Sequence, residues 1–324
     1  MNRREYMQGV IGLVGAAAMT RYATAADGPV ALPGAPMIAG PDPNTRTPAY
    51  KAPMGAVDTH CHIFGPVSRY PYVEKRSYTP PEAPLAKFRE LHHKIGIERA
   101  VIVNPTVHGF DNRPVTDAIA QSNGAYRGLA NVNDKMTDRE LEDLARAGIK
   151  GCRFIFIARL KAKPDMSAFD RIMQRIKPLG WHVDLYLRAE ELGEWQPRLH
   201  SLPVDYVLDH MGLVNAAEGL EQPAFKALVA QLANDPKCHV KITGPERISR
   251  AGAPFHDAVP FARKLIETAP DRVIWGTDWP HPNVKIMPND GDLVDLIPLY
   301  APDPALQHKL LVANPEKLFG FAKL

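Results

Sequence analysis

Cysteine is scarce in this sequence: only Cys61, Cys152 and Cys238 occur among 324 residues. Their odd number, wide spacing and apolar surroundings argue against a disulfide framework or a cysteine metal site, and predict buried free thiols. A large excess of charge is also absent, because 39 lysines and arginines are opposed by 36 acidic residues. No basic stripe with interleaved aromatic residues occurs, so no nucleic acid partner is expected.

Long apolar runs are missing as well. The apolar run near the start, Val10–Met19, is too short to span a bilayer comfortably. It follows the pair Arg3-Arg4 and precedes Ala23–Ala25, which has the small-x-small pattern of a cleavage site. These features predict a twin-arginine export signal over residues 1–26. We expect the mature protein in the periplasm with no stable membrane anchor after cleavage, or in the cytoplasm if the signal is not used.

The remaining chain divides into two parts. Residues 27–53 are rich in proline, glycine, alanine and threonine without a periodic pattern, which predicts a linker or an extended arm. Residues 54–324 alternate short β-rich runs with longer amphipathic segments such as Thr137–Gly148 and Pro223–Asp235. The β-rich runs are AVDTHCH, RAVIVNP, YRGLANVN, GIKGCRFIF, GWHVDLYL, VDYVLDHMG, CHVKITGP and RVIWGTDWP.

This alternation is typical of parallel strands joined by crossover helices. Eight such units are the number that closes a barrel, so the sequence predicts a (β/α)8 TIM barrel. A doubly wound open sheet is the alternative fold. No glycine-rich phosphate turn follows the first run, which ends in His-Cys-His, and this argues against the open sheet.

Active sites of such barrels are built at the carboxyl ends of the strands. His60 and His62 lie two residues apart on the first run, so both should face the same spot while Cys61 turns away. Other polar residues occur at later strand ends, and their convergence predicts an enzyme. These residues are Thr106, Arg153, Tyr186, His210, Arg247 and Asp278.

Two kinds of chemistry fit the histidines and the aspartate. In one, a mixed imidazole and carboxylate set holds a single Zn²⁺ with water at any open position. In the other, no metal is present: the histidines donate hydrogen bonds to a carbonyl oxygen, and the aspartate takes a proton from water. The residues concerned are His60, His62, His210 and Asp278.

The arginines favour the metal-free chemistry. Arg153, Arg159 and Arg247 lie at or beyond strand ends, where each can bind a carboxylate in bidentate fashion. Arg153 also stands where a binuclear site would want a bridging lysine, and arginine cannot deprotonate to become a ligand. Simpler interpretations remain open, because Arg159 can be a solvated loop residue and Arg247 can pair with Glu246.

Seven segments together resemble the 2-pyrone-4,6-dicarboxylate hydrolases, which are lactonases in the metal-independent branch of the amidohydrolase superfamily. The resemblance runs from about Ala52 to the end of the chain. LDHMG and WGTDWPHP are typical of the wider group of lactonases. KGCRFIF, followed by a second arginine six residues after its own, is closer to the dicarboxylate hydrolases. The segments are DTHCHIFGP, RYPYVEKRSYTP, HGFDN, KGCRFIF, WHVDLY, LDHMG and WGTDWPHPN.

The resemblance implies a role for each matching residue in a barrel that requires no metal or other cofactor. Asp278 matches the aspartate that activates water. A small anionic lactone from aromatic-compound degradation is the implied partner. Thr106 replaces a family serine and keeps its hydroxyl. His60, His62 and His210 match the histidines that polarise the lactone carbonyl, and Arg153, Arg159, Arg247, Tyr78, Thr106 and Tyr186 match the residues that hold the substrate.

Two alternatives differ from this function. One is a mononuclear zinc amidohydrolase or decarboxylase of the same superfamily, with one Zn²⁺ as its cofactor. The other is an exported carboxylate-binding protein without catalytic activity, although the complete set of candidate residues argues against a disabled site. An export signal also departs from the cytoplasmic family pattern, so an exported member would meet a different lactone. The sequence does not indicate an oligomeric state.

Overall fold

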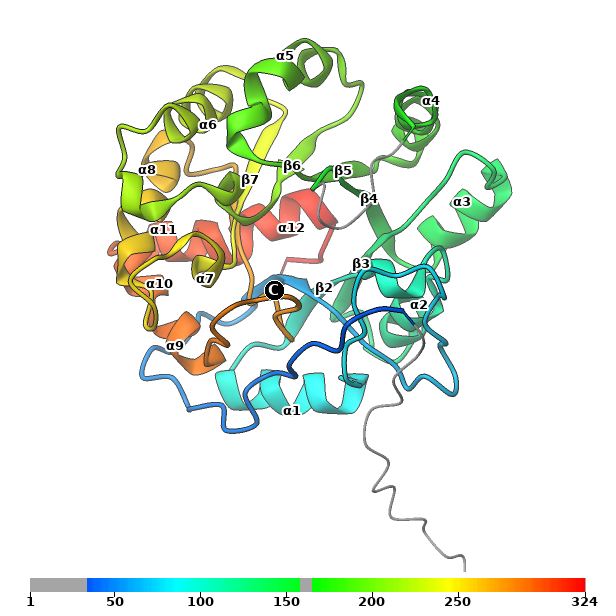
Figure 1. Cartoon of the computed structure of the whole chain (residues 1–324), viewed down its shortest axis with the longest axis horizontal. Helices are drawn as coiled ribbons and strands as arrows, with labels where there is room; N and C mark the ends of the chain where they lie inside the picture. Colours follow the sequence, from blue (N-terminus) through cyan, green and yellow to red (C-terminus); the bar gives the residue numbers. More distant parts are fainter. Residues whose placement is uncertain (1–33, 158–164, 324) are drawn as a thin grey trace, which may run out of the picture. The chain divides into compact units, whose positions relative to one another are not determined.

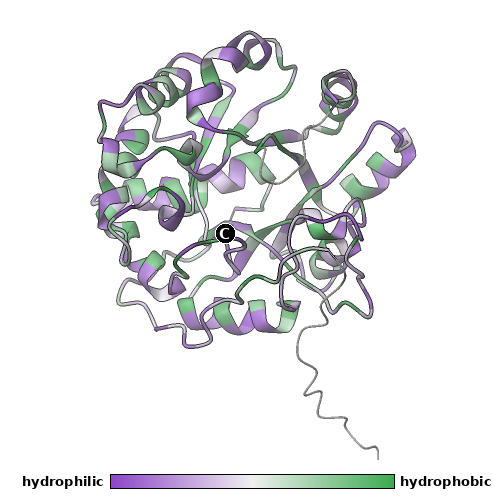
Figure 2. Ribbon diagram, viewed as in Figure 1, coloured by the Kyte–Doolittle hydropathy of each residue, from purple (hydrophilic) through white to green (hydrophobic). Residues whose placement is uncertain are grey.

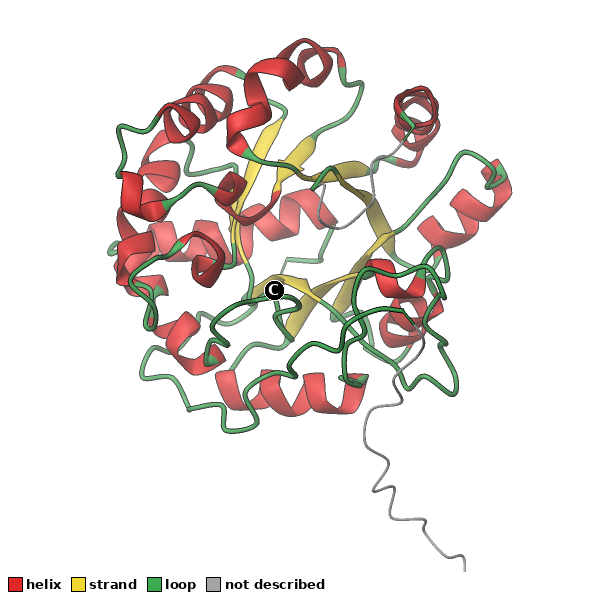
Figure 3. Ribbon diagram, in the orientation of Figure 1, coloured by secondary structure: helices red, strands yellow, loops and turns green. Residues whose placement is uncertain are grey.

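The predicted β-rich runs form one parallel sheet. The computed structural model describes residues 34–157 and 165–323. Its sheet has eight strands in sequence order, and each is parallel to the next. The (β/α)8 TIM barrel is confirmed (Figures 1 and 3). The strands are β1 (Val57–Cys61), β2 (Arg99–Val103), β3 (Tyr126–Ala130), β4 (Ile149–Ile155), β5 (His182–Tyr186), β6 (Tyr206–Leu208), β7 (Cys238–Ile242) and β8 (Val273–Trp275).

Hydrogen bonds near the carboxyl ends bring the last strand back to the first. The Asp278 N–H donates to the His60 carbonyl at 2.7 Å, and the His62 N–H donates to the Trp279 carbonyl at 2.7 Å. Asp58 strengthens the junction, since its Oδ1 accepts from the Thr277 N–H at 3.0 Å. The end of β1 and the loop after β8 are therefore held side by side.

Helices surround the strands on the outside (Figure 3). Figure 2 shows both hydrophobic and hydrophilic residues along these helices, as expected when one side covers a sheet. Local signals fix some ends: Thr137 and Glu140 form a capping box at the start of α3. The long helices are α1 (Leu85–Ile95), α2 (Arg113–Ala120), α3 (Asp138–Arg146), α4 (Met166–Ile176), α5 (Leu192–Ser201), α6 (Pro223–Asn234) and α8 (Val259–Thr268).

Shorter helices complete the chain, and the last of them closes the amino-terminal end of the barrel. Phe319, in α12, and Phe321 pack with Val57, Val101 and Ile274 in an apolar cluster. The polar residues described below lie farther along the same strands. The short helices are α7 (Pro245–Ile248), α9 (Asp290–Asp295), α10 (Ile297–Tyr300), α11 (Pro304–His308) and α12 (Asn314–Phe319).

The predicted linker or arm is described from residue 34 onward. Its residues 34–53 contain no helix and run along α9 (Figure 1). Arg46 forms an ion pair with Asp292 at 2.7 Å, and the Tyr50 N–H donates to Asp295 at 2.8 Å. Two predictions, the export signal over residues 1–26 and the role of Arg159, fall outside the described residues. Among those described, no helix is both long and apolar enough to cross a membrane.

Candidate active site

The structure brings the predicted site residues together at the carboxyl ends of the strands. They line a small cavity of about 30 Å³, room for about two water molecules. His60 lies directly behind it, with Nε2 3.7 Å from Oδ1 of Asp278. Arg159 is the one predicted site residue whose position is not described. The predicted residues that line the cavity are His62, Tyr78, Thr106, Arg153, Tyr186, His210, Arg247 and Asp278.

Unusual backbone geometry aims several of these side chains. Val57 belongs to the barrel interior, and so does His60, three residues later. Strict alternation would put them on opposite faces, but the β1–β2 register shifts between Asp58 and Cys61. His210 and Asp278 adopt left-handed backbone angles, with φ of 51° and 69°. Such angles cost about 1–3 kcal/mol for residues other than glycine and are typical of functional sites.

Asp278 is the central carboxylate. Its Oδ2 accepts from Arg247 Nε at 2.7 Å, whereas its Oδ1 has no hydrogen-bond partner among the described residues. Burial alone would raise the pKa of Asp278, but the positive charge of Arg247 brings it well below its ordinary value. The carboxylate is therefore ionised at neutral pH, with one oxygen facing the cavity.

The three histidines differ in the partner of the nitrogen that faces away from the cavity. His62 Nδ1 lies 2.8 Å from the Val103 carbonyl oxygen, which can only accept, so the proton of a neutral His62 is on Nδ1. His60 Nδ1 instead lies 3.1 Å from the Lys241 ammonium, which can only donate. His210 Nδ1 lies 2.7 Å from the Thr243 hydroxyl, which can do either. Burial, followed by the charge of Lys241, lowers the pKa of His60 to about 3.

Arg153 is anchored below the cavity by an acid that sequence reasoning missed. Its Nε donates to Oδ2 of Asp209 at 2.8 Å. Its guanidinium lies 4.9 Å from the centre of the Tyr186 ring, within the range of a cation–π contact. The anionic partner required for burying Arg153 is thus present in the protein itself.

Asp209 is one of three charged residues beneath the cavity that were not predicted. The other two are Asp184 and Lys241. The Lys241 ammonium forms an ion pair with Asp184 and lies 3.6 Å from Asp209. Within a set of six residues the formal charges cancel, because Asp184, Asp209 and Asp278 oppose Arg153, Arg247 and Lys241. Outside this set, the buried Glu246 lies 3.8 Å from Arg247 Nε. Alternation along β5 and β7 could have revealed two of these residues, since Asp184 and Lys241 occupy positions of the same parity as Tyr186 and Thr243.

The positions of three side chains would suit a metal ion, and their protonation decides whether they can bind one. Nitrogen atoms of His60 and His62 and an oxygen of Asp278 lie within 4.8 Å of one another. His62 offers a free lone pair at Nε2, because its proton is directed to Val103. Nδ1 of His60 lies 3.1 Å from the Lys241 ammonium and 3.5 Å from Oδ1 of Asp209. Only if the proton of neutral His60 is on Nδ1 does Nε2 have a lone pair for a metal ion.

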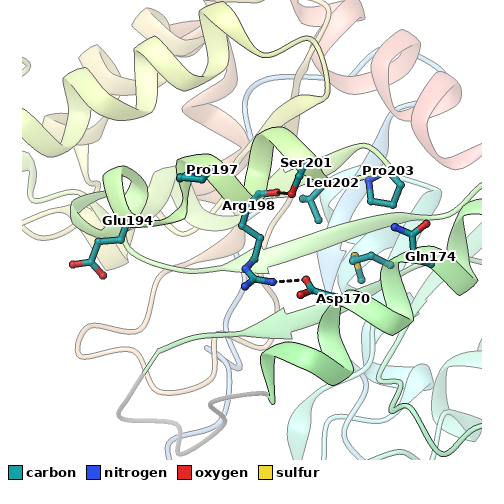
Figure 4. A pocket seen from close by; sticks show the side chains of 9 residues that line it. Asp170, Gln174, Glu194, Pro197, Arg198, Ser201, Leu202 and Pro203 are labelled. Carbon is teal, nitrogen blue, oxygen red and sulfur yellow. Dashed lines mark hydrogen bonds and ion pairs between the residues drawn. The ribbon is translucent and has the colours of Figure 1, made fainter.

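Two larger pockets lie outside this cavity. One, of about 540 Å³, shares Thr106, Arg153 and Ile155 with it and adds Lys75 and Arg76. The other, of about 560 Å³, lies between α4 and α5 and contains the Arg198–Asp170 ion pair (Figure 4). None of the predicted site residues that the structure describes lines this second pocket. We therefore assign no chemistry to it.

The amidohydrolase family model matches residues 57–321. The chain is 42% identical over 288 residues to a 2-pyrone-4,6-dicarboxylate hydrolase of Comamonas testosteroni, covering 85% of this chain and 93% of that one. It is 40% identical over 289 residues to a 4-sulfomuconolactone hydrolase of Hydrogenophaga intermedia, covering 88% and 95%. The chain therefore belongs to the amidohydrolase family, and the predicted relationship to lactone hydrolases is confirmed.

The fold is also shared with solved structures. A probable 2-pyrone-4,6-dicarboxylic acid hydrolase from Acinetobacter baumannii, with citric acid bound, superposes with a TM-score of 0.73 at 26% identity. The match covers 83% of this chain and all of the other one.

Proposed function

We propose that this protein hydrolyses a carboxylated lactone, with Asp278 as the base that activates water. The observation that carries this proposal is the pairing of two acceptors at the cavity. Oδ1 of Asp278 lies 3.4 Å from Nε2 of His62. In neutral His62 this nitrogen has a lone pair, because its proton is directed to Val103. A water molecule in the cavity that contacts both atoms can donate one O–H to each acceptor.

The reaction follows from this placement. The water oxygen attacks the ring carbonyl carbon while Asp278 takes a proton from it. The C–O bond of the ring then breaks, and Asp278 returns the proton to the leaving oxygen. We assign to His60, whose Nε2 lies 3.7 Å from Oδ1 of Asp278, the donation of a hydrogen bond to the carbonyl oxygen as negative charge develops there. A donor of this kind typically contributes about 3–4 kcal/mol to lowering the barrier.

The three histidines, which the sequence predicts to polarise the carbonyl together, therefore have different proposed roles. His60 donates to the carbonyl oxygen, and His62 orients water. His210 has Nε2 3.4 Å from Arg153 Nη2, so it accepts from the guanidinium and supports that side chain rather than the carbonyl.

The cationic residues favour an anionic substrate. Arg153 and Arg247 both line the cavity, and Lys75 and Arg76 line the adjoining pocket. Tyr78, whose pKa burial raises to about 12, remains a neutral hydroxyl beside them. The names of two relatives specify anionic lactones, and the related solved structure contains citric acid, a tricarboxylate. The substrate we propose is 2-pyrone-4,6-dicarboxylate or a similar anionic lactone.

We propose that no metal is required, because a proton on Nε2 of His60 would prevent this nitrogen from binding a metal ion. Activity should survive extensive treatment with EDTA. Loss of activity with EDTA and its return with Zn²⁺ would instead support the zinc enzyme.

The direct test is a screen of purified protein against anionic and neutral lactones, followed by the loss of ultraviolet absorbance as the pyrone ring opens. We expect turnover of dicarboxylated or sulfonated lactones and much weaker turnover of neutral ones. Absence of turnover with every lactone, together with tight binding of the carboxylates, would support the binding protein without catalytic activity.

A further inference from the structure

Lys241 is fully buried in the barrel interior, and no step of the proposed reaction uses it. It projects from β7, and its ammonium has three acceptors around it. It forms an ion pair with Asp184, lies 3.6 Å from Oδ1 of Asp209, and lies 3.1 Å from Nδ1 of His60. Lysine has three N–H donors and no acceptor, so its hydrogen bonds to Asp184 and His60 are both donations, whereas the contact with Asp209 is an ion pair.

The contact with His60 decides where the proton of that imidazole resides. Nδ1 must accept from Lys241, so neutral His60 carries its proton on Nε2. We propose that Lys241 is a positioning residue that fixes His60 in the Nε2–H tautomer, making it a hydrogen-bond donor and preventing it from ligating a metal ion. The donation to a lactone carbonyl rests on the proposed function, whereas the tautomer and the exclusion of metal do not.

The neighbouring histidine shows the opposite arrangement. Nδ1 of His62 faces the Val103 carbonyl at 2.8 Å, which leaves a lone pair on Nε2. The rings of His60 and His62 lie only 5.1 Å apart, centre to centre. Two histidines on one strand thus have opposite tautomers, because one is backed by a donor and the other by an acceptor.

Asp209 is the group that competes with Lys241. Its Oδ1 lies 3.5 Å from Nδ1 of His60 and would accept a proton from that nitrogen. The Lys241 contact is shorter, at 3.1 Å. In addition, the other oxygen of Asp209 already accepts from Arg153 at 2.8 Å. Removal of Lys241 should therefore let the proton of His60 move to Nδ1 and point at Asp209.

The test measures the tautomer directly. Protein labelled with ¹⁵N-histidine is studied by NMR, and the His60 signals are assigned by their disappearance in His60→Gln. Lys241→Met alone would leave the Asp184 carboxylate buried without its partner. The variant is therefore Lys241→Met/Asp184→Asn, which removes one charge of each sign. Asp184→Asn is the control for the loss of Asp184, because it keeps Lys241 with Asp209 at 3.6 Å as its remaining carboxylate.

We expect the proton of His60 on Nε2 in the natural protein and in the control, and on Nδ1 in the double variant. Titration of chelator-treated protein with Zn²⁺ should show binding at least about tenfold tighter in the double variant, the usual scale for outer groups of a metal site. A proton on Nδ1 in the natural protein overturns the proposal, and so does an unchanged tautomer in the double variant.

Activity gives a separate readout. If the protein is a lactonase, kcat of the double variant should fall at least about 10²-fold, as for loss of one oxyanion donor, with little change in KM. If the natural protein opens no lactone, the proposed function fails while the tautomer result stands. Because the natural protein alone can overturn the tautomer assignment, the proposal remains testable even if the double variant does not fold.

Discussion

Arg247 holds one oxygen of the Asp278 carboxylate and leaves the other to the cavity. Its Nε donates to Oδ2 at 2.7 Å, and Oδ1 has no hydrogen-bond partner among the described residues. The basicity of Asp278 therefore depends on where the Arg247 guanidinium lies. A substrate carboxylate that draws Arg247 away should raise the pKa of Asp278 and make it a stronger base when substrate is bound.

The first prediction concerns the base itself. Asp278→Asn keeps the size of the side chain but cannot take a proton from water. Turnover should fall by at least about 10²-fold, the lower end for loss of a general base. Binding of a dicarboxylated pyrone, measured by calorimetry, should be retained because a negative charge has left the site. Near-normal turnover would exclude Asp278 as the base.

The second prediction concerns pH. Arg247 keeps the pKa of Asp278 low, so the base of the natural enzyme stays ionised well below neutral pH. In Arg247→Met the effect of burial remains, and the acid limb of the kcat/KM profile should move up by about 1–3 pH units. A neutral lactone is the suitable substrate, because it does not need Arg247 for binding.

Arg250→Met is the matched control for that profile. Arg250 is exposed, and its side chain donates to backbone carbonyls rather than to Asp278. The control should keep the acid limb of the natural enzyme. An equal shift in both variants would show that general surface charge, rather than the ion pair, sets the profile.

The third prediction separates substrate charge from chemistry. Arg153→Met removes a buried cation, and Arg153→Met/Asp209→Asn does so without leaving its acid unpaired. Affinity for a dicarboxylated pyrone should drop by about 2–5 kcal/mol, as for loss of a buried carboxylate contact. Affinity for a neutral lactone should change far less in the double variant. An equal loss for both lactones would make Arg153 a structural residue.

The fourth prediction concerns stability and involves His281, which is fully buried. Burial alone would lower its pKa, but the carboxylates of Asp290 and Glu246 raise it to about 10. Since the folded-state value is the higher one, the stabilisation is complete below the unfolded-state pKa of about 6.5 and is lost as pH rises through about 10. Urea unfolding of the natural protein and of His281→Asn should therefore differ most near pH 6 and least above pH 10.

The fifth prediction concerns export, which we propose from Arg3-Arg4 and the apolar run that follows. Mass spectrometry of protein from the native host should find a mature chain that begins near Ala26 or Asp27 in the periplasmic fraction. Replacing both arginines by lysine should retain the protein in the cytoplasm. An intact Met1 terminus in the cytoplasmic fraction would refute export.

The fold was predictable because it depends on local patterns. All eight strands lie within the runs that the sequence predicts, since the alternation of β-rich and amphipathic segments is visible in neighbouring residues of the sequence. The strand-end rule then found most of the predicted cavity residues, because the carboxyl ends of parallel strands meet at one face. Tyr78 was implied only by the family resemblance.

The partners of those residues were not predictable. His60 and Lys241 are 181 positions apart, and Arg153 and Asp209 are 56 apart. Pairing them requires the order of strands around the barrel and the depth of each side chain, which depend on register. The register shift in β1 has no signal in the sequence that we can identify, yet it aims His60 into the interior.

The balanced set of buried charges constrains how this barrel can change over evolutionary time. Replacing any one of its six charged residues by a neutral one leaves an uncompensated charge in the core, which typically costs about 3–5 kcal/mol. That is a large fraction of the stability of an ordinary domain. A lineage drifting toward neutral lactones would have to lose cations and carboxylates in matched pairs. Ancestral intermediates should therefore be rare, and the substrate charge of this branch should be a conservative trait.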